Sequence, residues 1–208
     1  MLSAEQFFSF LLAASLVTAT PGPDNTMALS IGMSKGRIAG IAFGLGCSLG
    51  CLGHTLLTVL GLSALITASA EAFTALKITG GLYLLWLGIN ALRSSAHRSV
   101  KNDSNYVDSP KKLFQRGLLA NALNPKVAMF FLSFLPQFVV EGNDTATSQM
   151  AWLGLVFTAQ AVVIFSLIGY FSGSISQRLH TSPQIAVLLD RISGVIFMGY
   201  SQCPLVVP

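Results

Sequence analysis

Long stretches without a charged side chain recur along the chain. Asp, Glu, Lys and Arg are absent from residues 6–23, 38–70, 145–177 and 192–208, and a single lysine interrupts each of two further apolar segments. A membrane-spanning helix needs about 20 predominantly apolar residues. The pattern therefore predicts an all-α membrane protein with six transmembrane helices, at about residues 7–33, 39–63, 72–92, 117–139, 149–174 and 185–205.

Composition agrees with this assignment. Hydrophobic residues make up 52% of the 208 residues and charged residues only 10%, whereas soluble domains carry about 25% charged residues. A soluble domain and a disordered chain are both excluded. The net charge of +4 is too small for a nucleic-acid-binding surface. Three cysteines are too few for a disulfide scaffold or a zinc site, and we expect no metal or cofactor.

The basic residues are concentrated in alternate loops. The first, third and fifth predicted loops, with their flanks, hold Lys35, Arg37, Arg93, Arg98, Lys101, Lys111, Lys112, Arg116, Arg178 and Arg191. Because short cytoplasmic loops retain Lys and Arg, these loops are predicted to be cytoplasmic and both termini to lie outside.

The third loop, residues 93–116, is the most polar stretch and divides the spans into three plus three. We treat residues 1–208 as one transmembrane transporter domain whose halves, about 1–92 and 117–208, are joined by this loop. An odd number of spans in each half inverts the second half relative to the first. This is the architecture of inverted-repeat transporters, whose substrate sites lie near the midplane at discontinuous helices.

Each predicted half contains one helix that proline should break. Pro21, Gly22 and Pro23 interrupt the first span, and Pro125 interrupts the fourth. Proline removes a backbone donor and clashes with the preceding turn. A half-helix that starts after such a break points free N–H groups and a partial positive charge at whatever lies before it. The two breaks are predicted hinges of a transport site.

One charged residue follows each break. Asp24 follows Pro23, Lys126 follows Pro125, and helix geometry places both at a similar depth. A charge costs about 2.5–3.5 kcal/mol on a lipid-facing helix, so both should face the interior. One interpretation is a structural ion pair between them. The other is a zwitterion site, in which Lys126 and a helix N-terminus hold a carboxylate and Asp24 holds an ammonium group. Asp24 is also the candidate for coupling to protons.

At these residues the chain resembles the LysE/RhtB family of bacterial amino-acid exporters, over about residues 1–199. The resemblance implies six helices in the bacterial inner membrane, no enzymatic activity, and proton-coupled export of amino acids or derivatives such as lysine, homoserine, threonine, leucine or cysteine. It also implies Asn25, Asn121 and Asn124 as polar lining beside Asp24 and Lys126. The segment Tyr200–Pro208 departs from the family pattern, and its two prolines predict a short last helix. The matching motifs are Thr20-Pro21-Gly22-Pro23-Asp24, then Gly81-Leu82-Tyr83-Leu84 with Trp86, Gly88 and Arg93, then Phe114-Gln115-Arg116-Gly117 leading to Asn121 and Asn124-Pro125-Lys126.

Other functions are possible on different residues. Cys47 and Cys51 lie one helical turn apart and could serve a membrane thiol-disulfide electron carrier, or simply be small packing residues. His54 could be the base of a membrane-embedded hydrolase or acyltransferase, or a polar packing contact. Gln160 could line the cavity or bridge two helices. The series Gly36, Gly40, Gly44 and Ser48 permits close helix approach, either within the bundle or in a homo-oligomer.

Overall fold

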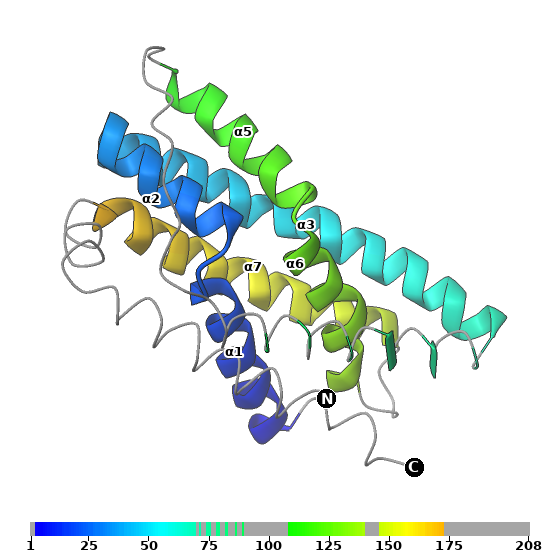
Figure 1. The fold of residues 1–208 in the computed structure, drawn as a ribbon. Coiled ribbons are helices and arrows are strands. Elements are labelled where there is room, and N and C mark those ends of the chain that lie inside the picture. Colours follow the sequence, from blue (N-terminus) through cyan, green and yellow to red (C-terminus); the bar gives the residue numbers. More distant parts are fainter. Residues whose placement is uncertain are drawn as a thin grey trace.

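The computed structural model describes residues 3–69, 108–139 and 146–172, together with residues 71, 74, 75, 78, 79, 82, 86 and 89. Within these ranges the chain is helical and contains no strand, which confirms the predicted all-α class (Figure 1). The principal helices are α1 (Ala4–Ala19), α2 (Pro23–Lys35), α3 (Arg37–Ala68), α5 (Pro110–Ala122), α6 (Pro125–Met129) and α7 (Ala146–Tyr170).

The first predicted span consists of two helices. α1 begins with a capping box between Ser3 and Gln6 and ends at Ala19. α2 begins at Pro23 with the extended Gly22 as its N-cap. Proline fits this first position because the N–H it lacks would have no partner inside the helix. The predicted break is thus confirmed, and the continuous span 7–33 is replaced by α1 and α2.

The second break lies where it was predicted, but its first helix starts earlier. α5 begins at Pro110 with Ser109 as its N-cap, rather than at residue 117, so the end of the predicted loop 93–116 is helical. The cause is local, since the Ser109 hydroxyl accepts from the Lys112 N–H and hydropathy does not register such caps. The helices on either side of the break meet at 50°.

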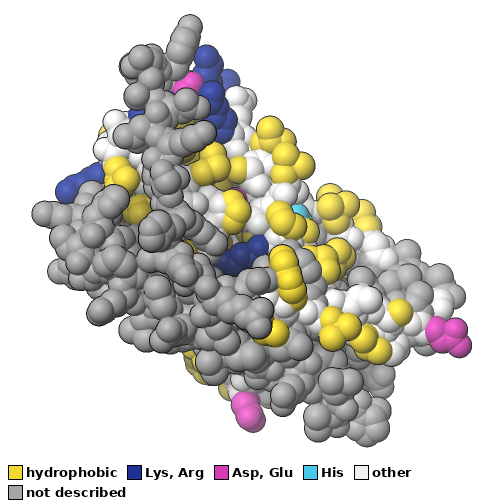
Figure 2. All heavy atoms as spheres, in the orientation of Figure 1, with side chains coloured by type: hydrophobic (Ala, Val, Ile, Leu, Met, Phe, Trp, Pro, Cys, Tyr) yellow, Lys and Arg dark blue, Asp and Glu magenta, His cyan; other side chains and the backbone are white. Residues whose placement is uncertain are grey.

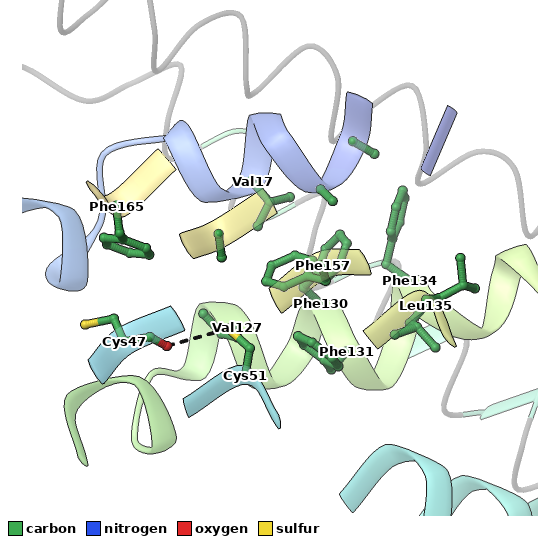
Figure 3. Close-up of a cluster of buried hydrophobic side chains, with 14 of the residues drawn as sticks. Val17, Cys47, Cys51, Val127, Phe130, Phe131, Phe134, Leu135, Phe157 and Phe165 are labelled. Atoms are coloured by element: carbon green, nitrogen blue, oxygen red, sulfur yellow. Dashed lines mark hydrogen bonds between the residues drawn. The ribbon is translucent and has the colours of Figure 1, made fainter. Parts of the chain in front are cut away.

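The segment after α6 is an irregular helix. A π-helical turn, η1 (Phe130–Phe134), and a 3₁₀ turn, η2 (Leu135–Phe138), continue α6. Their rings join Phe10 and Phe157 in a buried aromatic cluster, with ring centroids 4.8–6.5 Å apart. Figure 3 shows Phe130, Phe131, Phe134 and Phe157 gathered on one side of the core. The cluster packs the second half-helix firmly against α1 and α7.

α3 is the central helix and touches α5 and α7 closely. A Cβ on Gly46 would collide with the Phe114 carbonyl, and a Cβ on Gly117 would collide with the Phe43 carbonyl, so α3 and α5 meet backbone to backbone. Gly40 and Gly44 face α2 and α7 in the same way. Packing within the bundle therefore accounts for most of the predicted small-residue series, whereas Gly36 (φ 93°) serves the turn between α2 and α3. A homo-oligomer stays a prediction.

Two of the described helices are long and apolar enough to cross a membrane, Arg37–Gly61 and Ala146–Tyr170. The bent pair Pro110–Ala122 and Pro125–Phe138 makes a third if it is one span, and α1 is apolar but shorter. The predicted span 72–92 is described only at scattered residues, and the span 185–205 and the segment Tyr200–Pro208 lie outside the described residues. The six-span inverted repeat therefore stays a prediction.

Charged side chains gather at one end of the bundle, which we call the basic end and define by Lys35, Arg37, Asp108 and Arg116. Asp108 accepts from Lys35 at 3.1 Å and from Arg116 at 2.6 Å. The Lys35 hydrogen bond, with the nearby positive charges, lowers the pKa of Asp108 below its ordinary value of 3.8. Figure 2 shows the cluster of Lys and Arg at the upper end, with hydrophobic side chains over much of the described surface below it.

Candidate functional site

A small cavity lies where the two helix breaks meet. Its walls come from α1, α2, α3, α5, α6 and α7, and it has a volume of about 20 Å³, room for about one or two water molecules. All five predicted binding residues line it, and so does the predicted hinge residue Gly22. The lining residues are Val17, Thr18, Gly22, Asp24, Asn25, Cys51, Asn121, Asn124, Lys126, Val127, Phe157 and Phe165. The hinge prolines Pro21, Pro23 and Pro125 flank it in the chain.

The break between α1 and α2 leaves carbonyl groups without helical partners, and two predicted site residues bind them. The Asn25 side-chain amide donates to the Thr18 carbonyl at 2.7 Å. The Lys126 ammonium donates to the Thr20 carbonyl at 2.9 Å. Unwound backbone inside a membrane needs such partners. Lys126 thereby links the break of the fourth predicted span to that of the first.

Asp24 is buried, with 3% of its surface exposed. Its Oδ2 accepts from the side-chain amide of Asn121 at 3.0 Å, whereas its Oδ1 is buried and has no hydrogen-bond partner among the described residues. The structure shows no ion pair between Asp24 and Lys126, whose side chains bind Asn121 and the Thr20 carbonyl, respectively. The reason is the freed Thr20 carbonyl, which receives the Lys126 ammonium instead.

Asn121 connects three helices at the cavity. Beyond its bond to Asp24, its Oδ1 accepts from the Cys51 thiol at 3.7 Å, and its carbonyl lies 3.0 Å from Nε2 of His54. That carbonyl also accepts from the Asn124 N–H at 2.9 Å, since Pro125 has no N–H to offer it. A Cβ on Gly50 would lie only 2.7 Å from Asn121 Oδ1. The glycine therefore allows Asn121 to reach Asp24.

The two half-helix N-termini differ. α6 is capped by Asn124, whose side-chain oxygen accepts from the Lys126 N–H at 3.0 Å. α2 starts at Gly22 without a side-chain cap. A Cβ on Gly22 would lie 3.5 Å from the Lys126 ammonium nitrogen, so this cation lies beside the uncapped N-terminus. Two sources of positive potential thus meet at Gly22, while the unpartnered oxygen of Asp24 is the negative group of the cavity.

Sequence reasoning missed the apolar wall of the cavity and one of its hydroxyl groups. Val17, Val127, Phe157 and Phe165 are buried apolar side chains that line it, and Thr18 adds the hydroxyl. No motif marks these positions, because the sequence does not fix which face of a buried helix meets a cavity. Gln160 is not among the lining residues, but its amide donates to the Thr18 hydroxyl at 2.8 Å and bridges α7 to α1.

The residues of the alternative functions have structural contacts. Cys47 and Cys51 are free, buried thiols, and the Cys51 thiol donates to the Cys47 carbonyl at 3.7 Å. His54 binds the Asn121 carbonyl and packs on Phe131, with ring centroids 5.8 Å apart. Among the described residues, no group of three or more His, Cys, Asp or Glu side chains could hold a metal ion.

Comparison with known proteins gives consistent results. The LysE type translocator family matches residues 15–201. The chain is 31% identical to an uncharacterized membrane protein of Vibrio cholerae, over 93% of each chain. It is 32% identical to the homoserine/homoserine lactone efflux protein of Salmonella typhimurium, over 93% of each chain. It is 27% identical to the leucine efflux protein of an Enterobacter species, over 94% of this chain and 92% of that one. No solved structure matches the chain.

Proposed function

The chain belongs to the LysE type translocator family, and from this premise we propose that it is a non-enzymatic exporter of amino acids. The relatives named for leucine efflux and for homoserine efflux align over more than nine-tenths of the chain. We place the protein in the bacterial inner membrane with the basic end in the cytoplasm, because Lys and Arg are retained there.

The observation that best supports this proposal is the unpartnered Oδ1 of Asp24 in a cavity shared with Lys126. A buried acceptor without a donor costs about 1–3 kcal/mol, and more when it is charged. The ammonium group of an amino acid would supply that donor. Its carboxylate would bind at Lys126 and the uncapped N-terminus of α2, where a helix dipole favours an anion.

The proposal also includes an inverted-repeat architecture and coupling of export to protons. The two broken helices both restart with proline at their first position, at Pro23 and Pro125. This equivalence supports two inverted three-helix halves, as in other transporters with midplane sites. We assign proton coupling to Asp24, because a proton on its free oxygen would remove the charge that holds the ammonium group and so favour release.

The test is counterflow of radiolabelled leucine, and separately of homoserine, in vesicles containing the purified full chain. Asp24→Asn and Lys126→Met should reduce counterflow at least tenfold, since each removes one charge that pairs with the substrate. Glu71→Gln and Lys111→Met are matched controls that remove the same charges at exposed positions, and they should transport normally.

The outcomes separate the parts of the proposal. Wild-type rates in folded Asp24→Asn or Lys126→Met protein would contradict the site. A wild-type protein that carries neither amino acid would contradict the function. Amino-acid accumulation that does not respond to an imposed pH gradient would contradict proton coupling alone.

A further inference from the structure

His54 is a buried histidine of α3 to which the proposed function gives no role. Its residue is 7% exposed, and its Nε2 lies 3.0 Å from the Asn121 carbonyl oxygen. A carbonyl oxygen can only accept a hydrogen bond, so Nε2 carries the hydrogen and donates it. The ring also packs on Phe131, with centroids 5.8 Å apart and an angle of 30° between the ring planes. His54 therefore has two contacts outside its own helix.

These two contacts lie on opposite sides of the second helix break. Asn121 belongs to α5, before the break, and Phe131 belongs to η1, which continues α6 beyond it. α3 contacts α5, α6 and η1 and passes beside the bend (Figure 1). The two sides of the break meet at 50°. Because the imidazole binds one side through a ring nitrogen and packs on the other through its face, His54 is placed to fix this angle.

The Asn121 carbonyl lies in the last turn of α5 and accepts from two donors. The Asn124 N–H reaches it at 2.9 Å from within the break, and His54 reaches it from α3. A carbonyl oxygen has two lone pairs and can accept both bonds at once. The C-terminal end of a helix also carries a partial negative charge, which favours a donor there. The bond from Asn124 is local, whereas the bond from His54 attaches the turn to another helix.

The same side of α3 also holds the Asn121 side chain. Gly50 precedes His54 by four residues and so shares its face of the helix. It leaves room for Asn121, because a Cβ on Gly50 would lie 2.7 Å from Asn121 Oδ1. The Cys51 thiol lies 3.7 Å from that oxygen, and the amide nitrogen donates to Asp24 Oδ2 at 3.0 Å. Asn121 thus connects the backbone that His54 binds to the carboxylate of the proposed site.

We propose that His54 is a positioning residue of the transport site: as a hydrogen-bond donor it fixes the second helix break and so keeps the Asn121 amide on Asp24. This role rests on the proposed function and adds a residue to its site. It needs an N–H at the place of Nε2, and it needs no proton to leave or join the ring. It therefore differs from the role of a proton carrier, whose ring must titrate in each transport cycle.

Two amide variants separate these roles, because neither amide titrates and the two differ in reach. The side-chain nitrogen of glutamine can occupy the place of Nε2, whereas that of asparagine reaches only the place of Nδ1. In vesicles containing the full chain, His54→Gln should support leucine counterflow near the wild-type rate. The matched variant His54→Asn should lose at least tenfold, as expected when a buried acceptor loses a donor.

Labelling of Cys51 gives a measure that does not depend on transport. Cys51 is 1% exposed and lines the cavity with Asn121. With Cys47 and Cys203 replaced by serine, N-ethylmaleimide should label Cys51 at least tenfold faster in His54→Asn than in His54→Gln. The reason is that a break without its donor opens more often and exposes the thiol.

Several results would overturn the role of His54. Wild-type counterflow in His54→Asn would do so, because the donor would then be dispensable. Poor counterflow in folded His54→Gln would do so as well, and this result does not require the asparagine variant to fold. A wild-type protein that carries neither leucine nor homoserine would instead contradict the proposed function. Equal labelling of Cys51 in the two amide variants would then contradict the role of His54 separately.

Discussion

At the scale of single residues, the site is built by polar side chains that bind backbone carbonyl groups at the two helix breaks. Asn25 and Lys126 bind carbonyls at the first break, and His54 binds the Asn121 carbonyl at the second. The charged residues could be predicted from sequence because an isolated charge in a membrane is costly. The hydrogen-bond partners of these charged residues could not be predicted. Whether the Lys126 ammonium binds the Thr20 carbonyl or the Asp24 carboxylate depends on the distances in the folded protein.

The contact between Gly50 and Asn121 leads to a prediction at this scale. Gly50→Ala would place a Cβ 2.7 Å from Asn121 Oδ1 and 2.8 Å from its Cβ, so Asn121 must move away from Asp24. We expect at least a tenfold loss of leucine counterflow, as for the loss of a buried hydrogen bond of about 1–3 kcal/mol.

Gly53→Ala on the same helix is the matched control, because a Cβ there would meet no atom of the described residues within 4 Å. Alanine in place of glycine stabilises a helix by about 0.5–1 kcal/mol, so this variant should transport normally and unfold at an equal or higher temperature. Normal transport by Gly50→Ala would show that the position of Asn121 does not matter.

At the scale of helices, Asp108 ties the end of α2 to the beginning of α5. Its side chain is 4% exposed and binds Lys35 of α2 and Arg116 of α5. Each of these helices is the half of a broken helix that lies toward the basic end (Figure 1). Hydropathy could not predict this link, because it assigned Asp108 and Arg116 to a loop and placed the start of the helix at residue 117 instead of Pro110.

The lowered pKa of Asp108 determines how this link depends on pH. A carboxyl group whose pKa is lowered by folding stabilises the folded state above its ordinary pKa, and the contribution disappears as the pH falls through the lowered value. The unfolding temperature of Asp108→Asn in detergent should therefore lie below that of the wild type by a constant amount from pH 8 to pH 5. The difference should close below the ordinary value of 3.8.

Lys111→Gln serves as its control, since Lys111 does not contribute to the shifted pKa of Asp108. It should unfold like the wild type throughout this range. A difference for Asp108→Asn that closed near neutral pH would mean that another group, and not Asp108, controls the link.

At the scale of the whole molecule, the sequence predicted the helical class, both breaks and the meeting of five polar residues in one cavity. It could do so because proline chemistry and charge burial act locally. The apolar wall of Phe157 and Phe165 escaped prediction, since all faces of α7 are similarly apolar. Which face meets the cavity depends on close contacts such as that of Gly44 with Phe165.

The position of the charges also predicts the orientation of the molecule. Two single-cysteine variants can be made in a protein without native cysteines, Glu5→Cys at the start of α1 and Lys111→Cys near the basic end. Both residues are exposed. A membrane-impermeant maleimide added to intact cells should label the first and not the second. Lysis should make both react, and labelling of Lys111→Cys in intact cells would reverse the assigned orientation.

The bond from His54 to the Asn121 carbonyl has a consequence for biogenesis. The hydroxyl groups of Ser48 and Thr55 bind carbonyls of their own helix, so they can enter a bilayer as soon as α3 is synthesised. The partner of His54 is 67 residues later in the chain. During translation, α3 therefore reaches the membrane with an imidazole whose acceptor does not yet exist. The contact between His54 and Asn121 can form only after α5 has been synthesised.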